Sequence, residues 1–394
     1  MAFLAVYAAR LDATGLQIGL ISAGPAAVSL LFTLPAGWWL QRRPIGRAVF
    51  WTSVYHRAFY FLWILVPLLA THQVPVLIWL VLAMSIPGAA LAVGFSALFA
   101  ETVPPECRGH VVGVRNGLFA VAFIAVSLLS GRILDTVRFP TSYQIVFTIG
   151  AVGAAMSSVH LWKIRPPSGV RPCVPRGSGD LAWPGMMRLL VDGLRAGGAQ
   201  RFLVRKPAAL IRAEVLCGAY GKLMAAVFAL HVALFLAVPL FPIHWVRNLG
   251  LSDGQIGLGT AVFYASVLPG SALLSRLVSR MGNQTLSALG VVFMSAYPAL
   301  MGASAGLGLF LVASALGGFG WSLVGGALTN YVLEKIPEDD RPAHLAWYNL
   351  AVNAGLLAGS LLGPVLATPI GMVPALMVFS VCRLAGALFI WRLR

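Results

Sequence analysis

The chain has 394 residues, of which 59% are hydrophobic and only 10% are charged. Soluble domains average about 45–50% apolar and about 25% charged residues, so this composition excludes an ordinary soluble enzyme or binding domain and indicates a membrane protein. The net charge of +16 does not indicate nucleic-acid binding, because half of it lies in residues 163–222, between apolar runs.

Apolar runs of about 20 residues, the length that crosses a hydrocarbon layer of ~30 Å, recur along the sequence. Read in chain order, they predict eleven complete spans, at residues 16–40, 48–71, 74–98, 111–131, 143–162, 223–246, 255–275, 284–303, 306–333, 344–366 and 372–391.

Residues 1–11 are apolar as well, but about ten helical residues rise only about 15 Å, half a crossing. We expect the second half of a first span whose beginning is missing. A cleaved signal peptide is the alternative, although no basic segment precedes the run and no small-residue cleavage site follows it.

The placement of basic residues predicts the orientation, because cytoplasmic loops are enriched in Lys and Arg. Alternate loops, the segment 163–222 and the C-terminal tail hold 22 of the 28 basic residues. The opposite loops hold only Arg10, Arg132, Arg138 and Arg247. The basic loops and the C-terminus are therefore expected on the cytoplasmic side.

The segment 163–222 carries 11 basic and 3 acidic residues. We expect a cytoplasmic linker over 166–222 that joins six-helix halves at 1–165 and 223–394. Each basic residue near an anionic inner leaflet contributes about 1 kcal/mol. An interfacial helix is expected around Met186–Leu194, where apolar and charged side chains lie on opposite faces, with a flexible tether as the alternative.

One polar passage occurs twice. ETVPPECRGHVVGVRN begins at Glu101 and EKIPEDDRPAHLAWYN at Glu334, 233 residues later, and each places Glu, six residues and then Arg. The sequence Gln-Ile-Gly-Leu also occurs twice, at 17–20 and 255–258. Landmarks repeated in one order predict two halves that run in the same direction, as parallel repeats of transporters do.

On these motifs the chain resembles the major facilitator superfamily over all of its length except the start. The loop between spans 2 and 3 of that family reads Gly-x-x-x-Asp-Arg-x-Gly-Arg. The first half matches it with Gly37, Gln41 in place of Asp, Arg42, and Gly46-Arg47 displaced by two residues; the second half has Ser275, Ser279, Arg280 and Gly282. The resemblance implies an all-α membrane protein of two six-helix bundles related by a pseudo-two-fold axis, with the first helix truncated.

In the resembling family these loops form a charge network that holds the inner side closed. The resemblance implies pairing of Glu101 with Arg42 or Arg47 and of Glu334 with Arg280. The expected gating network comprises Gly37, Arg42, Arg47, Glu101, Arg108, Arg280, Gly282, Glu334 and Arg341. The alternative is that Glu and Arg only mark helix ends at the headgroups.

The resembling fold binds its solute near mid-membrane, between the halves. A polar side chain in a membrane is costly without a partner and so marks a candidate contact, although many such groups only bond their own or a neighbouring helix. The candidates are Ser22, Ser29, Asn116, His231, Tyr264, Asn330, Asn349 and Asn353. Gly355, Gly359 and Gly363, four residues apart, instead predict close helix packing.

All 12 carboxylates fall in loops or at helix ends. A proton coupled to transport would therefore need His231 or His244, or a carboxylate on the missing half helix, while uniport and exchange stay open. Arg57 and Arg383 lie roughly 15 Å from basic helix ends. Snorkelling toward the inner headgroups is expected for both, with anion binding as the alternative.

The resemblance implies a secondary transporter that moves a small solute by rocking of its halves, with export slightly favoured because the cavity is apolar. No nucleotide loop, zinc motif or catalytic cluster is recognisable, so no enzyme activity, cofactor or metal is expected. The expected partners are the solute and the bilayer with anionic inner-leaflet lipids, without nucleic acid, for a monomer in the plasma membrane. A non-transporting protein on the same scaffold, such as a lipid scramblase or a sensor, is the alternative.

Overall fold

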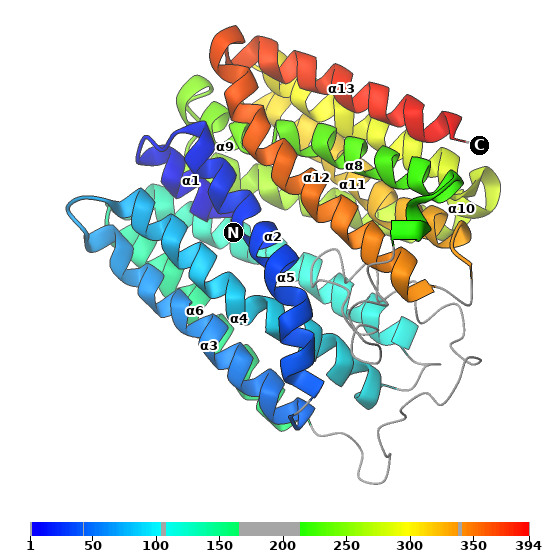
Figure 1. Ribbon diagram of the computed structural model, residues 1–394. Helices are drawn as coiled ribbons and strands as arrows, with labels where there is room; N and C mark the ends of the chain where they lie inside the picture. Colours follow the sequence, from blue (N-terminus) through cyan, green and yellow to red (C-terminus); the bar gives the residue numbers. More distant parts are fainter. Residues whose placement is uncertain (1, 42, 104–107, 165–212, 338–340, 394) are drawn as a thin grey trace.

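The computed structural model describes residues 2–41, 43–103, 108–164, 213–337 and 341–393, and Figure 1 shows them as packed helices. Within these ranges the regular secondary structure is helical, with no strand, so the predicted all-α class is confirmed. The predicted linker lies outside the described residues up to position 212, and this includes the helix expected near Met186.

The first group of helices covers the part of the chain before the linker. It comprises α1 (Ala2–Arg10), α2 (Gly15–Gln41), α3 (Ile45–Leu65) with the short turn η1 (Val66–Leu68), α4 (Gln73–Thr102), α5 (Arg108–Thr136) and α6 (Thr141–Lys163). The second group follows the linker. It comprises η3 (Ala213–Leu216), α8 (Ala219–Leu236), α9 (Leu240–Ile243), the π-helical turn η4 (His244–Asn248), α10 (Asp253–Ala303), α11 (Leu307–Glu334), α12 (Arg341–Ile370) and α13 (Met372–Arg392).

All eleven predicted spans fall on these helices, and α1 occupies the predicted half span. Nine helices of the described chain are long and apolar enough to cross a membrane. This number counts α10 once, although it contains two predicted spans, and leaves out α3, which carries Arg47, His56 and Arg57.

Two irregularities interrupt the helices of the second group. Inside α10 the chain turns at Gly282, whose φ of 76° and ψ of 162° are tolerated because glycine has no Cβ. The span that begins with α8 breaks at Pro239 and continues through α9 and η4, because Pro239 and Pro242 have no N–H to donate.

Each group has its own packing. In the first group α4 packs against α2 and α3, and α3 packs against α6; in the second, α8 packs against α12, and α10 packs against α11 and α13. The predicted close contact of α12 is confirmed, because a Cβ on Gly359 would lie 2.5 Å from the carbonyl oxygen of Val232 in α8. Gly355 and Gly363 approach α8 in the same way.

The two ends of the molecule differ. We define the linker end as the end where α6 stops at Lys163 and α8 begins at Ala219, and the sealed end as the opposite one, where α1 stops at Arg10. Between the groups, α2 contacts α12 and α5 contacts α10. Figure 1 shows α2 and α12 close together near α1 and separating toward the linker end. The pseudo-two-fold relation between the groups stays a prediction.

Candidate functional site

A polar cluster at the sealed end joins the two groups through Arg10. Its Nη2 donates to the carbonyl oxygen of Leu251 at 2.7 Å and lies 3.4 Å from Oδ1 of Asp253. Asp253 is only 9% exposed, and its carboxylate is stabilised by the N-terminal dipole of α10, whose first residue it is. A guanidinium on a carbonyl is a charge-assisted hydrogen bond, a class that contributes about 1.5–3 kcal/mol.

The cluster extends to α5 and α6. The hydroxyl of Ser252, which caps α10, donates to Oδ2 of Asp135 at 2.8 Å. The hydroxyl of Tyr143 lies 3.4 Å from Oδ2 of Asp253. Asp135 and Asp253 belong to the loops and helix ends that carry few charged residues in the sequence. A charged residue is unusual there, and this could have marked both as candidates.

Arg247 makes a second connection between the groups. Its Nη2 donates to the carbonyl oxygen of Ala13 at 2.9 Å, and so satisfies a backbone acceptor in the loop between α1 and α2. It also lies 3.5 Å from Oδ1 of Asp12, but that carboxylate side chain is 92% exposed. An exposed pair of this kind contributes about 0–1 kcal/mol, so the backbone contact is the stronger one.

Small residues allow the helices of the two groups to touch beside this cluster. A Cβ on Gly131 of α5 would lie 2.9 Å from Cα of Gly254, and one on Gly257 of α10 would lie 2.6 Å from the carbonyl oxygen of Ser127. A Cβ on Gly19 of α2 would lie 2.5 Å from the carbonyl oxygen of Ser360. We call the polar cluster and these glycine contacts the seal.

Substitution of Gly257 by Val should prevent the seal from closing, because the added methyl groups meet the backbone of α5 and not a movable side chain. The reporter is a cysteine at Ser127, a position 5% exposed beside Gly257. We expect Gly257→Val to raise its alkylation rate by a membrane-impermeant maleimide about tenfold, as a loss of about 1.4 kcal/mol would. The control is Gly117→Val, because a Cβ there has nothing within 4 Å; equal alkylation rates in both variants would contradict the prediction.

Next to the glycine contacts, aromatic rings extend the contact between α5 and α10 along the two helices. The ring centroids of Phe123 in α5 and Tyr264 in α10 are 4.5 Å apart, and Phe119 lies 4.4 Å from Phe123. Phe119 is 41% exposed, while Phe123 and Tyr264 are half-buried. Tyr264 is one of the residues predicted from the sequence, but both phenylalanines were not predicted, because phenylalanine in an apolar helix gives no separate signal. Their i, i+4 spacing with Ser127 and Gly131 is the pattern that marks one face of α5.

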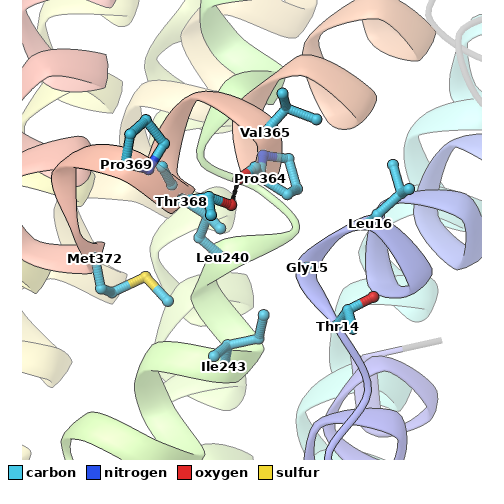
Figure 2. Close-up of a pocket in the computed structure, with 11 residues that line it drawn as sticks. Thr14, Gly15, Leu16, Leu240, Ile243, Pro364, Val365, Thr368, Pro369 and Met372 are labelled. Carbon is cyan, nitrogen blue, oxygen red and sulfur yellow. Dashed lines mark hydrogen bonds between the residues drawn. The ribbon is translucent and has the colours of Figure 1, made fainter.

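A pocket of about 540 Å³ lies beside the seal. Figure 2 shows that it is shared by the groups: Thr14 and Leu16 face it from the start of α2, and Leu240, Ile243 and the end of α12 from the other side. The hydroxyl of Thr368 donates to the carbonyl oxygen of Pro364 at 2.9 Å and so faces the pocket already bonded. The lining carries no charged side chain.

The gating network predicted at the linker end is only partly described. Arg42 and the side chains of Glu101, Arg108 and Arg341 lie outside the described part of the chain. Gly37 is buried in α2, and Arg47 and Arg280 are exposed.

The predicted pairing of Glu334 with Arg280 is not present in this conformation, and it stays a prediction for a closed linker end. Oε1 of Glu334 accepts a hydrogen bond from Nδ2 of Asn283 at 2.6 Å, and no ion pair joins it to Arg280 in the described structure. The turn at Gly282 places Asn283, and not the arginine, next to α11.

The predicted solute contacts have different environments. Asn116 is exposed, while Ser22, Ser29 and Asn330 are half-buried. Asn349 and Asn353 donate to the carbonyl oxygens of Leu345 and Asn349 in their own helix. His231 is buried beside Gly355 of α12, and its Nδ1 lies 2.8 Å from the carbonyl oxygen of Val227. A role of these residues in solute contact stays a prediction.

Snorkelling does not describe Arg383, which is 2% exposed. Its Nη1 donates at 2.8 Å to the carbonyl oxygen of Met294, which has no helical partner because Pro298 lacks an N–H. Its other nitrogens donate to Ala233 and Leu234, just before the break at Pro239. Arg383 therefore satisfies carbonyl groups that two helix irregularities leave open.

Arg57 is bonded to hydroxyl groups between α3 and α6. Its Nη1 donates to Ser53 and Ser158 at 2.8 Å, and its Nη2 donates to Ser157 at 2.9 Å. Ser53 lies one turn toward the linker end, so the side chain is directed as snorkelling predicts.

Comparison with known proteins gives a consistent result. The family model described as "Major Facilitator Superfamily" matches residues 1–220 and 223–394. The Quinolone resistance protein NorA of Staphylococcus aureus (strain MRSA252) is 19% identical over 137 residues, which is 35% of this chain and 35% of that protein. The match thus spans about a third of the relative's length.

Solved structures show the same fold. The nucleoside transporter NupG has a TM-score of 0.71 at 12% identity, with 100% of this chain and 94% of that chain covered. A bacterial homologue of the iron transporter ferroportin, in an inward-facing state, has a TM-score of 0.68 at 14% identity, with 100% and 93% covered.

Proposed function

Because the chain belongs to the major facilitator superfamily, we propose that it is a secondary transporter that moves a small solute by alternating access between its two helix groups. The observation that carries the proposal is the seal, which joins the groups through Arg10 and Asp253 at one end. Contacts that close one end only are what a protein needs if it opens its two sides in turn.

The linker end is the cytoplasmic one in this proposal, because its loops carry most of the basic residues. The present conformation is then closed toward the outside and open toward the cytoplasm. The similarity to a ferroportin homologue solved in an inward-facing state supports this orientation.

In the opposite conformation the linker end would close and the seal would part. Glu101 and Glu334, with the arginines of the loop α2–α3 and Arg280 before the turn at Gly282, are proposed to hold that end shut. For this, Glu334 exchanges its present partner, Asn283, for a cation. One sheltered charge-assisted bond of about 1.5–3 kcal/mol changes a two-state population about tenfold or more.

The solute is proposed to be an apolar or aromatic compound that contacts Phe119, Phe123 and Tyr264. These rings come from both groups, and Phe119 is accessible. No carboxylate lies deep in a span, so the surface selects against solutes that need an acidic partner. Export is favoured over uptake, and the relation to a quinolone resistance protein supports this direction.

Flux measurements in liposomes test the proposal. Purified protein should give saturable flux of a hydrophobic dye, and Asp253→Asn should lower the initial rate severalfold, because the buried carboxylate loses its attraction for Arg10. The matched control is Asp12→Asn, whose exposed carboxylate contributes little and should leave the rate unchanged. Exchange of lipid between leaflets without saturable solute flux would instead identify a scramblase.

A further inference from the structure

A groove of about 990 Å³ lies on the first helix group, away from the seal. Its walls are α2 and α3, and Ile86, Pro87 and Ala90 of α4 line its floor. It forms because α2 and α3 both pack against α4 but touch each other little. None of its lining residues belongs to the seal.

The two cations of the groove lie at its linker end. Arg43 follows the end of α2, and Arg47 lies in the first turn of α3. The guanidinium carbon of Arg43 is 4.7 Å from the ring centroid of Trp39, so a cation–π contact holds it in the groove. In the described part of the chain no carboxylate forms an ion pair with either arginine.

The remainder of the groove is apolar and open. Trp51 is 52% and Tyr55 is 60% exposed, and Phe32 lines the groove further along α2. The hydroxyl of Thr52 is already bonded, because it donates to the carbonyl oxygen of Ala48 at 2.8 Å. An exposed Trp near a helix end, as Trp51 is near the start of α3, is typical of the level where headgroups meet hydrocarbon.

We propose that this groove binds an anionic phospholipid from the leaflet at the linker end. Arg43 and Arg47 take the phosphate and headgroup, and one acyl chain lies along Phe32, Tyr55 and Ile86. A water-soluble anion would leave the apolar length of the groove empty, and a neutral lipid would bring no negative charge to the two arginines. The charge at one end and the apolar length together match an amphiphile with an anionic head.

Photolabelling of the purified full chain tests this site. The probe is phosphatidylglycerol with a photoactivatable acyl chain, presented in neutral detergent micelles, and the expected labelled peptides lie within residues 32–55 and 86–90. Arg43→Gln together with Arg47→Gln should lower this labelling about tenfold or more, because the variant removes both cations that attract the anionic headgroup. The control pair, Arg276→Gln with Arg392→Gln, removes two exposed arginines of the same end elsewhere and should leave labelling unchanged.

A second variant keeps both arginines and fills the groove. Ala36→Leu adds a branched side chain to its wall and should lower acyl-chain labelling severalfold, while monodispersity in size-exclusion chromatography reports folding. Equal labelling by a phosphatidylcholine probe, labelling outside the groove, or displacement by millimolar inorganic phosphate would each overturn the proposal. Retained labelling in the double arginine variant would overturn it too.

Discussion

Oxidation of a cysteine pair at positions 135 and 252 should abolish solute flux, and reduction should restore it. In the structure Oδ2 of Asp135 and the hydroxyl oxygen of Ser252 are 2.8 Å apart across the seal. A cysteine sulfur at position 135 would lie one bond short of Oδ2, so the disulfide forms after a small approach of the two helix ends. A covalent bond there keeps the two groups together at this end. If transport needs the seal to part, no turnover is possible while the bond exists.

The experiment uses a chain in which the four native cysteines are replaced by Ser. The matched control is a cysteine pair at Ser53 and Ser158, whose hydroxyl oxygens are 2.7 Å apart within the first group. Cross-linking of that pair should leave flux near the level of the reduced protein. Undiminished flux in a fully cross-linked 135–252 pair would exclude alternating access through this seal.

Arg383→Met should strongly destabilise the folded protein. The side chain is buried, and its loss leaves the carbonyl groups of Met294, Ala233 and Leu234 without their donor. Each unsatisfied buried group costs about 1–3 kcal/mol, so the total loss is on the order of several kcal/mol. A large fall in the melting temperature, or in the yield of monodisperse protein, is the expected readout.

Arg57→Met is the matched comparison, because it also removes an arginine with three hydrogen bonds inside a span. Its partners are serine hydroxyls, and those of Ser53 and Ser158 already lie 2.7 Å apart and can bond to each other. The loss should therefore be much smaller than at Arg383. Equal melting temperatures for the two variants would show that the carbonyl groups near Pro298 and Pro239 do not depend on Arg383.

The same comparison shows why sequence alone predicts snorkelling for both arginines. Depth along a helix can be counted from the sequence, and that count places both about equally far from a basic end. Which face of the helix carries the arginine, and whether a proline on a neighbouring helix has left a carbonyl open, depends on packing. Met294 and Pro298 lie 89 and 85 residues from Arg383 along the chain, and their relation to it arises only when α10 and α13 pack together.

For the predicted gating residues, too, the sequence predicts the position along the helix but not the contact partner. The repeated Glu and Arg positions do lie at or beside helix ends, but the partner of Glu334 in this conformation is Asn283, which the turn at Gly282 brings to it. The pairing of Glu334 with Arg280 stays a prediction for a closed linker end. No sequence pattern predicted the seal. Arg10, Asp135 and Asp253 lie at the ends of three different helices, and no spacing rule relates residues that meet only through tertiary packing.

The sequence by itself determined that this protein is helical, where its long apolar helices lie, and which family it resembles. These properties depend on apolar runs and repeated local motifs, which follow from the cost of an unsatisfied backbone in hydrocarbon. The tertiary structure decided which end is closed, which polar groups join the two helix groups, and where a groove remains between α2 and α3. Those features depend on contacts between residues distant in the chain, so they exist only after the helices have packed.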